Sequence, residues 1–278
     1  MSLQVIQGGE SLTAIGLADY VWLARDNVVR CKKRAIQVPD DPDGQPIFLG
    51  QRWVCREGDE QYLLVPVFFF VDPLRPAPSF VTLCEVKTLD DQPVAWSSRS
   101  RLRTLLQGNR NVRYNWFGFR QPYRLTGDNA TRASYVAERH LGACLDAGLL
   151  IHSAEVSADG CCFKVGPRGF NDEIDPDQPD AVTASDHLLL ACHLLIKAAL
   201  DEGLGVEFQP RSITCSTLKL RTELSRAEAD KLGAALARLS ITPPRSVVDA
   251  VRRGVVAVEY QPQQLDPYSA GWSLLTAI

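Results

Sequence analysis

Apolar positions in the first third of the chain occur in short runs and in alternation, which predicts strands. Residues 20–25 (YVWLAR) and 28–36 flank Asp26 and Asn27, a pair that favours a tight turn, so they predict a hairpin. The other elements expected in this part are strands at 62–71 and 81–86 and a short helix at 97–106.

From about residue 108, segments with apolar residues at helical spacing occur between segments with the pattern of strands. Residues 131–147 carry apolar side chains at helical spacing and end at Gly148, which predicts an amphipathic helix. Ser185 is the expected N-cap of a long helix over 185–200. The remaining expectations are strands at 149–156, 161–165, 205–209, 213–220 and 255–260, a polar loop at 166–180, and helices at 226–239, 247–252 and around 272–275.

The stretch at 114–125, YNWFGFRQPYRL, reads as a strand of bulky apolar residues with one Gly. Its second half brings in polar groups, notably Arg120 and Gln121. Pro122 follows them and removes a backbone donor, which predicts that this part of the strand is at an edge or bulged.

Composition excludes several classes of function. The 278 residues, 45% hydrophobic and 23% charged, are ordinary for one large or two smaller globular domains. A net charge of -3 gives no electrostatic case for nucleic acid or an anionic membrane. The N-terminus lacks the basic start and apolar run of a signal peptide, and no apolar run reaches spanning length. We therefore expect a cytoplasmic protein without nucleic-acid or membrane partners.

The eight cysteines are scattered, without a CxxC pair, and most are expected to be small buried hydrophobes in a reducing compartment. The four histidines have no metal-binding spacing and are taken as structural. Arg99, Arg101 and Arg103 form a basic run of the kind that is usually a solvated face.

Several motifs in order resemble the glutamine synthetase family, in particular its short eukaryotic-type branch. YLLVPVFFFVDPLR and FVTLCEV are similar to the family's YLxPVxxFxDPFR and LVLCEV, and YNWFGFRQPYRL is similar to WFGxEQEYxL. ERHLGACLDAGL, SAEVSADGCCFKVGP and DPYSAGWSLL are similar to further family blocks. The resemblance covers nearly the whole chain.

The resemblance implies an α+β fold: an N-terminal β-grasp domain at 1–107, then a shortened glutamine synthetase-like catalytic-type domain at 108–278 with a curved antiparallel sheet and helices. It also implies a homo-oligomeric ring such as a decamer of two stacked pentamers, or a hetero-oligomer with an active paralogue.

The family's reaction uses ATP and Mg²⁺ or Mn²⁺, which need oxygen ligands such as carboxylates. By the resemblance, the two glutamates of the EQE motif are here Arg120 and Pro122, and the glutamate of WEFQVGP is Cys162. The histidine of the CHTNFST block is Ser216, which follows Cys215. Glu155 is the only retained ligand position.

Other parts of the family site are missing from the matched order. The insert with the flap glutamate and the LTGxHET block has no counterpart after residue 239, and the segment with phosphate-contacting arginines is reduced to YQPQQLDPY. The resemblance thus implies a pseudoenzyme that has lost ATP and metal, with no cofactor expected.

Two questions about the site stay open in the sequence. Glu155 either pairs with a nearby cation such as Arg120, which we favour, or retains a metal. Cys162 and Cys215, expected on neighbouring strands, either fill the pocket, which we favour, or provide a nucleophilic thiolate beside Arg120. The functional alternatives to a structural or regulatory pseudoenzyme are a repurposed enzyme using Cys162, Cys215, Glu155 and Arg120, and a divergent ATP-dependent glutamate–amine ligase.

Overall fold

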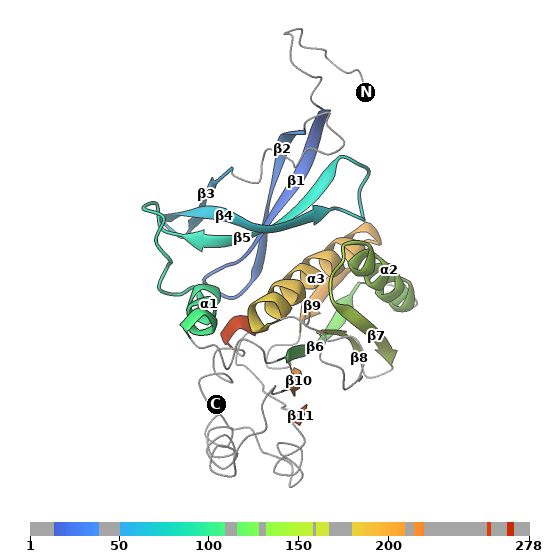
Figure 1. The fold of residues 1–278 in the computed structure, drawn as a ribbon. Helices are drawn as coiled ribbons and strands as arrows, with labels where there is room; N and C mark the ends of the chain where they lie inside the picture. Colours follow the sequence, from blue (N-terminus) through green and yellow to red (C-terminus); the bar gives the residue numbers. More distant parts are fainter. Residues whose placement is uncertain are drawn as a thin grey trace, which may run out of the picture. The chain divides into compact units, whose positions relative to one another are not determined.

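The computed structural model divides the chain into two compact units (Figure 1). The first comprises Met1–Ala24 and Arg30–Val94, and the second comprises Arg25–Val29 and Ala95–Ile278. The structure describes residues 14–38, 51–108, 116–127, 132–157, 160–166, 180–208, 214–219, 255–256 and 266–269.

The described part of the first unit is a five-stranded sheet in the order β2-β1-β5-β4-β3. β1 and β5 pair in parallel, while β5–β4 and β4–β3 pair antiparallel. β5 is buried along almost its whole length, as expected for a central strand that contacts neighbours on both sides. The strands are β1 Ala14–Leu23, β2 Val29–Val38, β3 Trp53–Glu57, β4 Glu60–Val71 and β5 Ser79–Lys87.

The predicted hairpin at the start of this unit is confirmed. Asn27 has φ 59°, and the Asp26 side chain accepts a hydrogen bond from Val28 N at 3.2 Å, so both residues close the turn between β1 and β2. Residues 39–50, between β2 and β3, lie outside the described residues, and the β-grasp assignment of this unit stays a prediction.

The second unit contains a mixed set of helices and strands. Its six-stranded sheet has the order β11-β10-β6-β8-β7, and β9 also pairs with β6. Every described pairing in it is antiparallel, as expected. The elements are α1 Ser98–Gly108, β6 Trp116–Thr126, α2 Ala133–Asp146, β7 Ile151–Ser157, β8 Gly160–Val165, α3 Ala181–Asp201, β9 Gly205–Phe208, β10 Thr214–Lys219 and β11 Val255–Val256.

Helix α2 ends where the sequence predicts. Gly148 has φ +69°, a left-handed conformation that favours glycine, and its N–H donates to Leu145 O at 3.0 Å. The chain then turns back into β7, so the helix and strand lie against each other.

Helix α3 begins earlier than expected. Asp180, not Ser185, is the N-cap: its carboxylate accepts from Thr183 N at 2.8 Å. Ser185 lies buried in the helix, and its hydroxyl donates to Ala181 O at 2.7 Å. A serine hydroxyl can donate to a carbonyl of the preceding turn inside a helix. Ser185 does so, and its presence therefore does not mark the N-terminus of α3.

α3 is the core helix of the second unit, in contact with α1, α2 and the sheet. Figure 1 shows α2 and α3 side by side. α3 is long and apolar enough to cross a membrane by length and composition alone, but most of it is buried inside the protein.

The division between the units falls at Val94, whereas the sequence analysis placed it at residue 107. Helix α1 accounts for the difference, because it packs on α3 and Arg99 in α1 pairs with Asp186 in α3. The expected helices at 226–239, 247–252 and 272–275, the loop at 167–179 and most of the strand at 255–260 lie outside the described residues.

Candidate functional site

The sheet of the second unit has one apolar face, built by alternate residues of β6 and β8. Phe119 and Tyr123 in β6 and Phe163 in β8 have no exposed surface. The Phe163 ring lies 6.1 Å from that of Tyr123 and 4.9 Å from that of His140 in α2. Because strand side chains alternate, the intervening residues point to the other face, where Arg120 and Cys162 lie.

On this other face, β6 and β8 bring Arg120 opposite Lys164, and Pro122 opposite Cys162. On the far side of β8, Cys162 is opposite Glu155 in β7. Directly opposed residues of an antiparallel pair have Cβ atoms about 5 Å apart. The register therefore gathers Arg120, Glu155, Cys162 and Lys164 into one polar cluster.

Pro122 lies where β6 has a paired neighbour on one side only, which agrees with the predicted local edge and not with the alternative of a bulge. β6 is an interior strand, and its register with β8 runs through Pro122 without a bulge. On its other side, β10 pairs with β6 up to Arg120 and β9 pairs from Tyr123 onward. Pro122 lies in the interval between these two partners, where a missing N–H leaves no bond unmade. Gln121 Nε2 donates to Pro122 O at 2.7 Å.

Glu155 accepts a hydrogen bond at each of its two carboxylate oxygens from the other members of the cluster. Lys164 Nζ lies 2.8 Å from Oε1, and the Cys162 thiol donates to Oε2 at 3.2 Å. The hydrogen bond from Lys164 is the main cause that lowers the pKa of Glu155, followed by the bond from Cys162. Half of the Glu155 side chain is exposed, so the carboxylate is ionised at neutral pH and reachable from solvent.

The cation paired with Glu155 is Lys164, not Arg120 as expected. Arg120 lowers the pKa of Glu155 only as a more distant charge. The expectation that a side-chain cation offsets Glu155 is confirmed, but the ammonium group supplies it. The sequence reasoning missed Lys164, although the period of two in CCFK places it on the same face as Cys162.

Cys162 is buried, and its pKa is raised. Burial is the largest cause and the hydrogen bond to the Glu155 carboxylate is the next, while the Arg120 charge acts in the opposite direction. A thiol that donates to a carboxylate keeps its proton at neutral pH. These directions favour the pocket-filling interpretation of Cys162 over the nucleophilic one.

Cys215 is not on a strand neighbouring that of Cys162. β6 lies between β10 and β8, and Cys215 holds the register position opposite Phe119, whereas Cys162 holds that opposite Pro122. The two cysteines are therefore separated by a strand and by three register positions. The side chain of Cys215 lies outside the description.

Two histidines have structural partners, in line with the expectation. His140 is fully buried in α2, and its Nε2 lies 2.9 Å from Ala191 O in α3, so Nε2 carries the hydrogen. Burial lowers the pKa of His140 to about 4, although the Ala191 carbonyl acts in the opposite direction. His187 Nδ1 accepts a hydrogen bond from Leu150 N at 3.0 Å.

Arg99 is not part of a solvated face. Its guanidinium donates twice to the Asp186 carboxylate, from Nε at 2.9 Å and from Nη2 at 2.8 Å. The Tyr268 hydroxyl donates to the same carboxylate at 2.7 Å, and Ser98 Oγ donates to Asp266 at 2.9 Å. These buried bonds attach the described C-terminal segment to α1 and α3.

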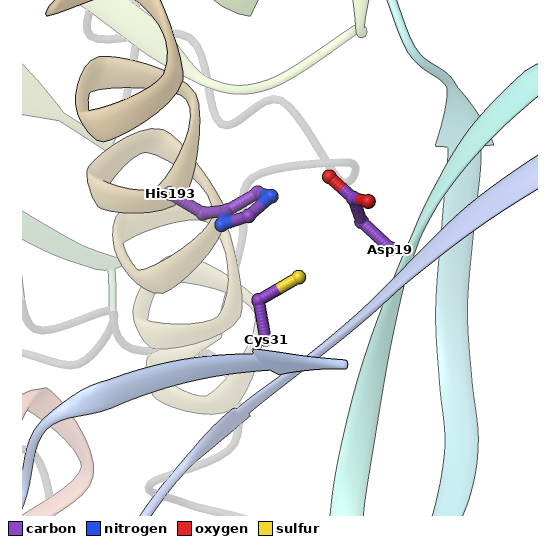
Figure 2. A group of neighbouring side chains, drawn as sticks. All are labelled: Asp19, Cys31 and His193. Carbon is purple, nitrogen blue, oxygen red and sulfur yellow. The ribbon is translucent and has the colours of Figure 1, made fainter. Parts of the chain in front are cut away.

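Figure 2 shows Asp19 on β1 and Cys31 on β2, both in the first unit, and His193 on α3 of the second unit. The Asp19 carboxylate is buried and accepts a hydrogen bond from Arg75 Nη1 at 3.1 Å. Because its charge is paired within its own unit, we assign Asp19 a structural role in fixing the turn after β4.

No protein-family model matches the chain. Among curated proteins it is similar to glutamine synthetases. The chloroplastic glutamine synthetase of Chlamydomonas reinhardtii is 24% identical over 253 residues, covering 74% of this chain and 64% of that protein. The glutamine synthetase of Neurospora crassa is 27% identical over 71% of this chain and 60% of that protein. The human glutamine synthetase is 27% identical over 74% of this chain and 59% of that protein. The chain thus spans less than two thirds of the length of these relatives.

Proposed function

We propose that this chain, a distant relative of the glutamine synthetases, is a catalytically degenerate homologue with a structural, regulatory or partner-subunit role. The observation that carries the proposal is the polar cluster of Arg120, Glu155, Cys162 and Lys164. By the resemblance, three of these residues stand where the family holds divalent metal with carboxylates.

The charge of the cluster supports this proposal. Arg120 and Lys164 each contribute one positive charge, Glu155 contributes one negative charge and the Cys162 thiol contributes none. The four groups therefore sum to one positive charge, which repels Mg²⁺ and the other cations that a phosphoryl-transfer site must hold. Both oxygens of Glu155 already accept a hydrogen bond and its charge is paired with Lys164, so a metal would compete with Lys164 for the carboxylate of the cluster.

The rest of the predicted biology belongs to the same proposal. ATP and Mg²⁺ or Mn²⁺ are lost as cofactors, and the chain assembles as a homo-oligomeric ring such as a decamer or joins an active paralogue. The compartment is a reducing cytoplasm, which is supported by the free cysteines among the described residues. The fold is that of the family, with a β-grasp first domain supported by the parallel pairing of β1 and β5 in the middle of the sheet.

An activity assay tests the proposal directly. Purified chain, with ATP, Mg²⁺ or Mn²⁺, glutamate and ammonia, should form no glutamine and should release no phosphate above the blank. Calorimetry should detect no magnesium-dependent ATP binding. A glutamine synthetase such as the human enzyme serves as the positive control. Glutamine formation, or metal-dependent ATP binding, would overturn the proposal.

A restored-ligand variant sharpens the test. Replacing Arg120, Pro122 and Cys162 with glutamate, and Lys164 with Gln, reverses the charge of the cluster and frees Glu155. We expect Mn²⁺ to bind this variant and not the natural chain, measured by calorimetry. If both bind Mn²⁺ equally, the present cluster does not exclude metal.

A repurposed, cysteine-dependent enzyme is the alternative function. It requires a thiolate, and Cys162 is a hydrogen-bond donor whose pKa is raised. Labelling with iodoacetamide at pH 7 distinguishes the degenerate homologue from a cysteine-dependent enzyme. For the degenerate homologue we expect slow alkylation of Cys162. Fast alkylation that disappears in a Cys162→Ser variant would favour the alternative.

A further inference from the structure

The two arginines on the polar face of β6 have different cross-strand neighbours. Arg124 lies opposite Glu207 in β9, an acid–base pair of the usual stabilising kind. Arg120 lies opposite Lys164 in β8 and opposite Thr214 in β10. Arg120 therefore has a like charge at one neighbouring position and a neutral residue at the other.

Like charges directly opposite each other destabilise an antiparallel pair, unless an anion lies near both. Glu155 offers one negative charge to both cations: its Oε1 accepts from Lys164 Nζ, whereas Arg120 acts on it only as a more distant charge. Across the described residues, no carboxylate forms an ion pair with Arg120. Arg120 is partly exposed.

We propose that the cluster around Arg120 and Lys164 binds a small oxyanion, a phosphate or carboxylate group. The planar guanidinium supplies two parallel donors to such a group, and the Lys164 ammonium adds a charge from the neighbouring strand. Glu155 limits the site, because its negative charge lies on the far side of Lys164 and repels the anion. This inference deepens the proposed function and rests on it: the same position takes an anion instead of a metal.

Substitution of Glu155 tests the cluster itself, because this carboxylate lies beside Lys164 and its charge should oppose a bound anion. Glu155→Gln removes the repelling charge and releases Lys164, so it should tighten anion binding. Arg120→Gln removes the guanidinium donors and should weaken binding. The expected change for Arg120→Gln is at least about tenfold, the factor that a charged hydrogen bond contributes.

The experiment is calorimetric titration of the full chain with inorganic phosphate and, separately, with acetate, in a buffer of constant ionic strength set with NaCl. These two probes distinguish a phosphate source from a carboxylate source. We expect one or both to bind the natural chain, less tightly in Arg120→Gln and Lys164→Gln and more tightly in Glu155→Gln. Arg124→Gln is the matched control, because Arg124 lies on the same strand and face, and it should leave the affinity unchanged.

Three outcomes would overturn the inference: neither probe binds the natural chain, Arg120→Gln binds as tightly as the natural chain, or Arg124→Gln weakens binding as much as Arg120→Gln. Circular dichroism and thermal unfolding of each variant confirm that it is folded. The result is independent of the activity assay, because glutamine formation would overturn the proposed function whether or not an anion binds, and failure of both probes would leave the degenerate assignment standing.

Discussion

The buried His140 makes a specific prediction about stability and pH. Its ring lies in the core between α2 and α3, and burial lowers its pKa from 6.5 to about 4. In the unfolded chain the imidazole takes up a proton near its ordinary pKa of about 6.5, whereas the folded chain resists protonation until about pH 4. Well above pH 6.5 the imidazole is neutral in both the folded and the unfolded chain, so His140 contributes no pH dependence to stability. As the pH falls through this window the unfolded state binds more protons, so stability is lost.

The magnitude follows from the separation of the two pKa values. Each pKa unit corresponds to about 1.4 kcal/mol, so a separation of about 2.5 units gives a full loss of about 3 kcal/mol below pH 4. At pH 5 the unfolded state is almost fully protonated at this position and the folded state is barely protonated, so the loss is about 2 kcal/mol relative to pH 7.

Urea unfolding at pH 7 and pH 5, at fixed protein concentration, measures this loss. The matched variant is His140→Gln, because the glutamine Nε2 can donate to Ala191 O as the imidazole does, yet it does not titrate. Natural chain and variant share every other titrating group, so the difference between their pH dependences isolates His140. We expect the natural chain to lose about 2 kcal/mol more than the variant between pH 7 and pH 5. Equal losses in the two proteins would refute the assignment of His140 as a neutral buried group.

Three further predictions concern other described contacts. Asp186→Ala removes the carboxylate that accepts two hydrogen bonds from the Arg99 guanidinium and should cost about 3–5 kcal/mol in urea unfolding, whereas the double variant Arg99→Met/Asp186→Leu should recover most of it; equal losses would contradict the ion-pair argument. Asp180→Ala removes the N-cap of α3 and should cost about 1 kcal/mol by the same measurement, and no change would show that this end of the helix is not capped by Asp180. Lys164→Gln should raise the pKa of Glu155 in an NMR titration, because its largest favourable partner is removed, and an unchanged pKa would place the controlling charge elsewhere.

The sequence by itself determined the elements whose signals are local. The turn at Asp26 and Asn27, a strand at 114–125 and a helix ending before Gly148 were all predicted, because alternation, helical period and positive φ depend on residues close in the chain. It also indicated three of the four residues of the polar cluster, since Arg120, Glu155 and Cys162 stood out against the pattern of a distant family, whereas Lys164 did not.

Only the tertiary structure decided which of these residues meet. Strand order placed β6 between β8 and β10, which separated Cys215 from Cys162. Register placed Lys164 opposite Arg120 and within reach of Glu155, so the ammonium group took the partner that the guanidinium was expected to hold. Pairing between strands far apart in the chain depends on the order and register of the whole sheet, and a shift of one residue would move every side chain to the opposite face. The sequence therefore indicated most of the residues of the cluster, and the sheet added Lys164 and determined which charges in the cluster are opposed.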